Sequence, residues 1–170
     1  MSTVLILTVQ FALSILLAAL AAYLGIWLFE RATKDIDEWE EIRQGNPAIG
    51  VTLAAMVIGL AIILRPAVAG ALPSGGGRIA PDLGPSLYVF SVLLLMLVRA
   101  LLGLVLGIAA ILFAIWLFIR LTQELDEMAE LRDGNMAVAA VLAGVIIAIA
   151  VLVSPAVIGI TDGLLAVLFP

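Results

Sequence analysis

The chain has 170 residues, of which 65% are hydrophobic and only 12% are charged. This composition lies outside the range of soluble domains and indicates an integral membrane protein. The chain contains no cysteine and no histidine, which excludes disulfides, thiol catalysis, iron–sulfur clusters and histidine-based acid–base chemistry. The net charge of -5 arises mainly from two short segments, and no basic patch indicates a nucleic acid partner.

Four apolar runs are long enough to cross a bilayer as helices. No positive charge precedes the first run, so we expect a permanent span and not a cleaved signal peptide. Asn46-Pro47 is a favourable start for the second span, and Arg65-Pro66 is expected to end it. The fourth is expected to end at Ser154-Pro155. The runs cover residues 3–29, 47–64, 87–119 and 136–153.

A charged segment occurs twice. Residues 26–46 and residues 115–135 lie 89 positions apart and are identical at just over half of their positions without a gap, so the chain contains an internal repeat. The predicted organisation is a first unit over 1–72, a Gly/Pro-rich linker over 73–86, a second unit over 87–158 and an apolar C-terminal tail over 159–170.

Each unit reads as a span, a charged segment and a second span. Because two crossings return the chain to its starting side, the two units are parallel repeats, and both charged segments lie on one side of the membrane. More Lys and Arg residues lie near these segments than at the opposite side. The positive-inside bias therefore predicts cytoplasmic charged segments and both termini outside.

The charged segment is expected to turn near residues 30–33 and to lie along the membrane surface as an amphipathic helix, because the next span starts directly after it. The sequence predicts an apolar stripe in each copy, with carboxylates on the opposite side. Trp27 and Trp116 lie where an aromatic belt is expected. The stripes comprise Ala32, Ile36, Trp39 and Ile42, and Leu121, Leu125, Met128 and Leu131.

Asp37 to Asn46 and Asp126 to Asn135 both read Asp-Glu-x-x-Glu-x-Arg-x-Gly-Asn. With the aromatic-rich turn before each and the Gly/Ala-rich span after each, the chain resembles the small bacterial membrane family called domain of unknown function 350. The resemblance covers most of the chain. It implies an all-α, four-span inner-membrane protein with no established activity, and it provides no catalytic residues.

Two sets of carboxylates are the first candidates for a site. Spacings of three and four place each set on one helical face. Their hard oxygen donors could hold Mg²⁺ or Ca²⁺, or line a cation vestibule. The alternative is a solvated face that binds a partner. The sets are Asp37, Glu38 and Glu41, and Asp126, Glu127 and Glu130.

Other positions have structural interpretations. The pairs Gly45-Asn46 and Gly134-Asn135 are expected to end one helix and cap the next. Small residues, among them Gly103, Gly107 and Gly144, predict close helix packing. Arg99 is expected near the outer surface, where it either snorkels or forms a salt bridge with Asp162 in the tail. A role for Arg99 in an ion path is the alternative.

The sequence therefore indicates a homo-oligomeric membrane component with a structural or partner-binding role, in contact with the lipid bilayer and a cytoplasmic or membrane protein. Enzyme activity, a cofactor and a bound metal are not expected, because nucleophile and phosphate-binding motifs are absent. The alternative is a homo-oligomeric ion channel or small-solute pore with a carboxylate-lined cytoplasmic mouth. The spans offer few polar groups for such a path.

Overall fold

The computed structural model describes residues 2–33, 37–69, 85–122 and 126–168. Over these residues the chain forms six helices and no strand. Four of them are long and apolar enough to cross a membrane, as predicted. The helices are α1 (Ser2–Ala32), α2 (Glu38–Arg43), α3 (Pro47–Ala69), α4 (Pro85–Leu121), α5 (Glu127–Arg132) and α6 (Met136–Leu168).

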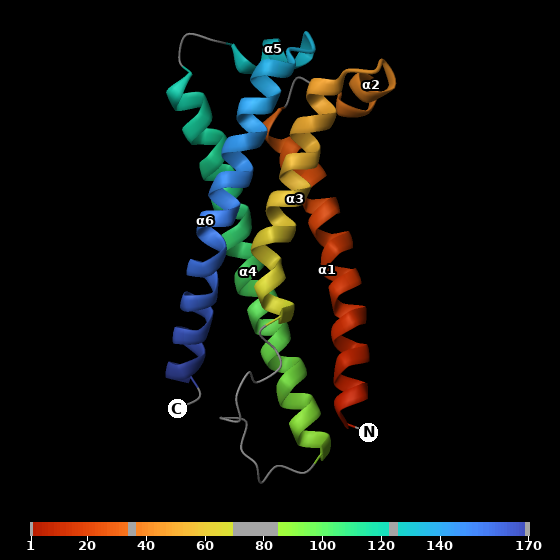
Figure 1. The fold of residues 1–170 in the computed structure, drawn as a ribbon, viewed down its shortest axis with the longest axis vertical. Coiled ribbons are helices and arrows are strands. Elements are labelled where there is room, and N and C mark those ends of the chain that lie inside the picture. The colour runs from red at the N-terminus through yellow and green to blue at the C-terminus, as the bar shows by residue number, and fades with distance from the viewer. Residues whose placement is uncertain (1, 34–36, 70–84, 123–125, 169–170) are drawn as a thin grey trace.

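The long helices run side by side, with the short α2 and α5 at the same end of the bundle (Figure 1). Helix α3 packs against α1, α4 and α6, and α4 also packs against α6. Helices α1 and α6 lie at opposite edges of the bundle. The start of α1 and the end of α6 lie at the end away from α2 and α5. The first half (residues 2–69) and the second half (85–168) thus run in the same direction.

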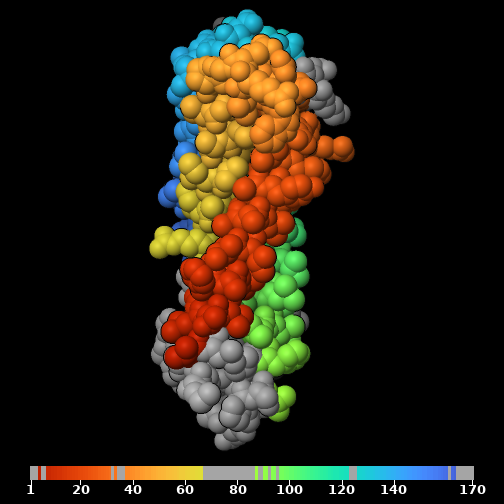
Figure 2. Space-filling model, turned by 90° about the vertical axis from the view of Figure 1, so that its right-hand side faces the viewer, coloured from red at the N-terminus to blue at the C-terminus, as the bar shows by residue number. Residues whose placement is uncertain are grey.

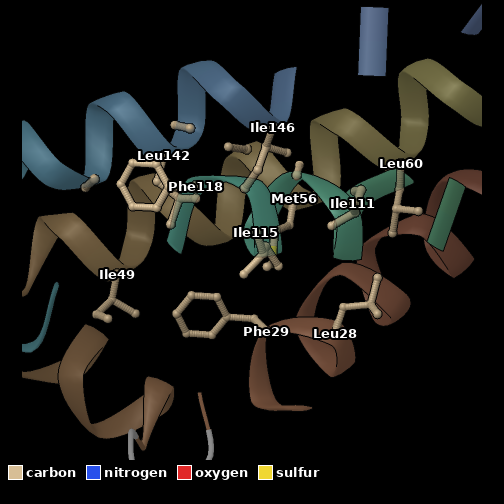
Figure 3. Packing of buried hydrophobic residues seen from close by; sticks show 14 of the residues in the cluster. Leu28, Phe29, Ile49, Met56, Leu60, Ile111, Ile115, Phe118, Leu142 and Ile146 are labelled. Carbon is tan, nitrogen blue, oxygen red and sulfur yellow. The ribbon is translucent and has the colours of Figure 1, made fainter. Parts of the chain in front are cut away.

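The core of the bundle contains apolar side chains from all four long helices (Figure 3). It runs along α3 from Ala48 to Leu64 and includes Leu131 of α5. Phe29 and Phe118, which are 89 positions apart, are 1% and 3% exposed. Many large apolar side chains on the outside are exposed, as expected for a surface in contact with lipid. The labelled core residues are Leu28, Phe29, Ile49, Met56, Leu60, Ile111, Ile115, Phe118, Leu142 and Ile146.

Two helices continue past the prolines that were predicted to end them. Helix α3 contains Pro66 and α6 contains Pro155. The described residues of the predicted tail over 159–170 continue α6. A proline cannot donate to the carbonyl four residues earlier, but membrane helices tolerate this when a neighbouring side chain donates instead. For Pro66 this donor is Ser154, whose Oγ lies 3.2 Å from the Ile62 carbonyl.

Some predictions concern residues outside those that the structure describes. The predicted linker over 73–86 is one of these, except for its last two residues, which start α4. Ile36 and Leu125 of the predicted apolar stripes are others.

Candidate functional site

The two charged segments form matching connectors. We call Thr33 with residues 37–46 the first connector, and Thr122 with residues 126–135 the second connector. Helix α1 ends at Ala32, where a turn was expected. Asp37 caps α2 by accepting a hydrogen bond from the Glu40 amide at 3.0 Å. Asp126 does the same for α5, accepting from the Ala129 amide at 3.2 Å. A side-chain oxygen at this position satisfies an otherwise free amide of the first turn.

The second carboxylate of each connector is buried. Glu38 is 5% exposed, and its Oε1 lies 3.0 Å from the Thr33 hydroxyl, which also lies 2.7 Å from the Phe29 carbonyl. Glu127 is 6% exposed and is hydrogen-bonded to the Thr122 hydroxyl. Each threonine therefore joins its connector to the last turn of the preceding span.

This burial differs from the predicted position of one carboxylate. Glu38 was expected on the polar face, opposite an apolar stripe with Trp39 and Ile42 along the membrane surface. In the structure Glu38 faces inward, whereas Trp39 is 52% and Ile42 37% exposed. The hydrogen bond to Thr33 offsets the cost of burying the carboxylate. The second connector differs, because Leu131 is fully buried and Met128 is half-buried.

The third carboxylate and the Gly-Asn pair form the turn into the next span. Gly45 and Gly134 have φ values of 81° and 79°, a conformation that favours glycine. The Asn46 side chain accepts from the Ala48 amide at 3.0 Å and so caps α3, and its Nδ2 donates to Glu41 Oε2 at 2.8 Å. The Asn135 side chain accepts from the Ala137 amide at 3.0 Å, and its Nδ2 donates to Glu130 Oε2 at 2.6 Å.

Asn46 has a further role that the sequence did not indicate. Its Nδ2 also lies 3.0 Å from the Leu131 carbonyl and 2.9 Å from the Arg132 carbonyl, both at the end of α5. The Asn46 side chain thus caps α3, forms a hydrogen bond within the first connector and joins this connector to the second. No local pattern could have predicted this contact, because the residues are 85 and 86 positions apart.

The six candidate carboxylates therefore have separate partners within their own connectors. Among the described residues, no group of three or more Asp or Glu side chains could hold a metal ion. Asp37 and Asp126 cap helices. Glu38 and Glu127 accept hydrogen bonds from threonine hydroxyls, and Glu41 and Glu130 accept hydrogen bonds from asparagine side chains. These hydrogen bonds shape the two connectors.

The candidate packing glycines have different surroundings. A Cβ at Gly107 would lie 3.2 Å from Ile63 Cγ2, and one at Gly103 would lie 3.6 Å from Leu64 Cδ2. These two glycines let α4 approach α3. Gly144 lies on an exposed side of α6, with no atom within 4 Å of such a Cβ. Sequence reasoning did not single out Gly25, where a Cβ would lie 2.8 Å from Val57 Cγ2.

Arg99 pairs with Asp162 at a nitrogen–oxygen distance of 2.6 Å, in agreement with the salt bridge considered from the sequence. The Arg99 side chain is 15% exposed and that of Asp162 is 53% exposed. The pair joins α4 to the part of α6 beyond Pro155, far from both connectors.

Comparison with known proteins places these features in a family. A family model described as Domain of Unknown Function (DUF350) matches residues 2–157, which include both connectors and nearly all of the four candidate spans. No curated protein and no solved structure matches the chain. The chain is a multi-pass membrane protein that belongs to the Domain of Unknown Function (DUF350) family.

Proposed function

We propose that the protein is a non-enzymatic scaffold of the bacterial inner membrane, which associates with copies of itself and presents its connectors to a protein partner. The apolar interior of the bundle is the main support. Among the described residues the buried polar side chains are Thr33, Glu38, Thr52 and Glu127, and of these only Thr52 lies within a span. Its hydroxyl donates to the Ala48 carbonyl of its own helix at 2.9 Å.

A hydrated path through one chain would need more polar groups than this. The side chains of all four long helices fill the centre of the bundle with hydrocarbon. This arrangement favours a scaffold over an ion channel or small-solute pore with its path inside a single chain.

The distribution of positive charge supports an orientation. Arg31, Arg43, Arg120 and Arg132 lie close to the connectors, whereas Arg65 and Arg99 lie in the other part of the described bundle. By the positive-inside bias, the connectors face the cytoplasm and both termini face outward. The matching order of elements in the two halves is consistent with a duplicated, parallel two-helix unit.

The connectors are suited to partner binding because their own hydrogen bonds fix their shape. The exposed positions include Trp39, Glu40, Arg43 and Gln44 in the first connector, and Arg132 and Asp133 in the second. A partner would meet an aromatic side chain beside charges of both signs. Neither connector would need to become ordered on binding, which lowers the entropic cost of association.

A flux assay in liposomes tests the proposal against the channel. Purified protein reconstituted into liposomes should give no cation flux above that of protein-free liposomes. Glu41→Gln with Glu130→Gln should likewise leave flux unchanged and should retain insertion. A cation current from the wild-type protein that the double substitution abolishes would overturn the scaffold proposal.

A further inference from the structure

We infer that copies of the chain associate head to tail in one membrane, with α6 of one copy packed against α1 of the next. The contact between them repeats the contact that joins the two halves of a single chain. This inference rests on the proposed homo-oligomeric scaffold and names its partner and surface. We call the residue 89 positions away in the other half the counterpart of a residue.

Within one chain, α4 packs in the groove between α1 and α3. The α3 residues of this contact are buried: Leu60 and Ile63 are 0% exposed and Leu64 is 2% exposed. The α4 side comprises Ala100, which is 6% exposed and clusters with Leu17 of α1, followed by the close contacts at Gly103 and Gly107.

The counterpart groove, between α4 and α6, is open. Ile149, Leu152 and Val153 are the counterparts of Leu60, Ile63 and Leu64, but Leu152 is 77% exposed. A groove of about 360 Å³ lies here, and those three residues line it together with Leu106 and Ala110, the counterparts of Leu17 and Ala21. A surface that α4 covers in the first half therefore has no cover in the second half of the described chain.

The complementary surface is open on α1. Phe11, Ser14 and Ala18 are the counterparts of Ala100, Gly103 and Gly107. Phe11 is 68% exposed, whereas its counterpart Ala100 is 6% exposed. Ser14 and Ala18 also line a hollow of about 290 Å³ beside α3. Figure 2 shows this side of the molecule, with α1 in red and α3 in yellow.

Gly144 also lies at a position that is exposed in the second half and buried in the first half. Its counterpart is Ala55, which is 2% exposed in the core. In α6 the site is exposed, with no atom within 4 Å of a Cβ placed on Gly144. A residue with no side chain at this point would let a helix of another copy approach closely.

Polar groups at both ends of the contact have counterparts as well. Asn46 reaches the Leu131 and Arg132 carbonyls, so Asn135 would reach the Ile42 and Arg43 carbonyls of the next copy. Ser154 donates to the Ile62 carbonyl, which faces Pro66. Pro155 likewise leaves the Val151 carbonyl without its usual helical donor. Arg65 is the counterpart of Ser154 and lines the hollow on the next copy, so it would donate to this carbonyl.

The directions of the helices make the contact possible within one bilayer. Both halves run the same way, and α1 and α6 lie at opposite edges. The next copy would therefore keep the same orientation in the membrane. Such a heterologous contact either closes into a ring or continues as a row.

Engineered cysteines test this contact directly, because the chain has none of its own. A Cβ at Gly107 would lie 3.6 Å from Ile63 Cβ, within the range that a disulfide spans. Ile63→Cys with Gly107→Cys should therefore crosslink within one chain and serves as the positive control. The counterpart pair, Leu152→Cys with Ala18→Cys, should crosslink between chains in native membranes treated with a membrane-permeant oxidant.

The expected product is a ladder of dimers and larger species that thiol reduction reverses. The matched control is Leu152→Cys with Leu16→Cys, because Leu16 lies on the opposite side of α1 and is 66% exposed. The inference is overturned if the two pairs crosslink equally, or if Leu152→Cys alone forms dimers as readily as the pair. The first result would indicate random collision, and the second a two-fold contact between α6 helices.

A second measurement covers the case in which the cysteine variants fail to insert. Single-molecule photobleaching of wild-type protein in native membranes should give more than one chain per spot, and Ala18→Trp should lower that number while Leu16→Trp should not. Single chains in the wild type would overturn the inference. The scaffold proposal is tested separately, because it fails on a cation current and not on the crosslinking pattern.

Discussion

The Ser154 hydroxyl lies 3.2 Å from the Ile62 carbonyl and donates to it, 92 positions away in the sequence. This carbonyl is the one that Pro66 leaves without its usual helical donor. A side chain of α6 thus supplies the hydrogen bond that lets α3 continue to Ala69.

Replacing Ser154 with Ala should lower the free energy of unfolding by about 1 kcal/mol, the size of a typical hydrogen bond between membrane helices. The measurement is thermal or denaturant unfolding in detergent micelles. In a Pro66→Ala background the same substitution should have little effect, because the backbone amide of the new alanine would itself donate to the Ile62 carbonyl. An equal loss in both backgrounds would show that Ser154 acts by other contacts.

Gly107→Leu should destabilise the monomer, whereas Gly144→Leu should not. A side chain at Gly107 must displace Ile63 and Leu60, whose Cγ2 and Cδ2 atoms would lie 3.2 and 3.4 Å from its Cβ. Overpacking of this kind costs about 1–3 kcal/mol. Gly144→Leu should leave the melting temperature of detergent-isolated monomer unchanged but reduce crosslinking between copies. Equal melting temperatures for both variants would contradict the packing described for α4.

Asn46→Ala should cost more stability than Asn135→Ala in monomeric protein. Both substitutions remove a helix cap, worth about 1 kcal/mol. Asn46→Ala also removes the hydrogen bonds to α5, each worth about 0.5–1.5 kcal/mol. Unfolding measurements on the two variants in the same detergent give the difference, and a smaller loss for Asn46→Ala would argue against the bridge between the connectors.

Single cysteines should report the orientation. A cysteine at Glu40 or Ala129, both exposed in the connectors, should resist a membrane-impermeant maleimide added to spheroplasts and react after lysis. A cysteine at Gly163, exposed near the other end, should react before lysis. Labelling of the Glu40 variant from outside would reverse the proposed topology.

The main features of the fold could be predicted because they depend on local pattern. Apolar run length predicted four spans, and the Gly-Asn pairs predicted turns that need only adjacent residues. The continuation past Pro66 could not be predicted, because its donor is on another helix. The burial of Glu38 was also missed, since periodicity places a carboxylate outward unless the contribution of Thr33 is known. The bridge from Asn46 depends on how the two halves meet.

Helix α4 has 37 residues, which is about 55 Å at the usual helical rise. The hydrocarbon core is only ~30 Å thick, and the connector end of α4 lies at the charged surface beside α5. Roughly 20 Å of continuous helix lies beyond Arg99, which is itself fixed to α6 through Asp162. The part of α4 before Arg99 carries exposed apolar side chains, among them Leu87 and Phe90, which favour lipid over water. The helix would therefore tilt further as the bilayer thins and stand more upright as the bilayer thickens.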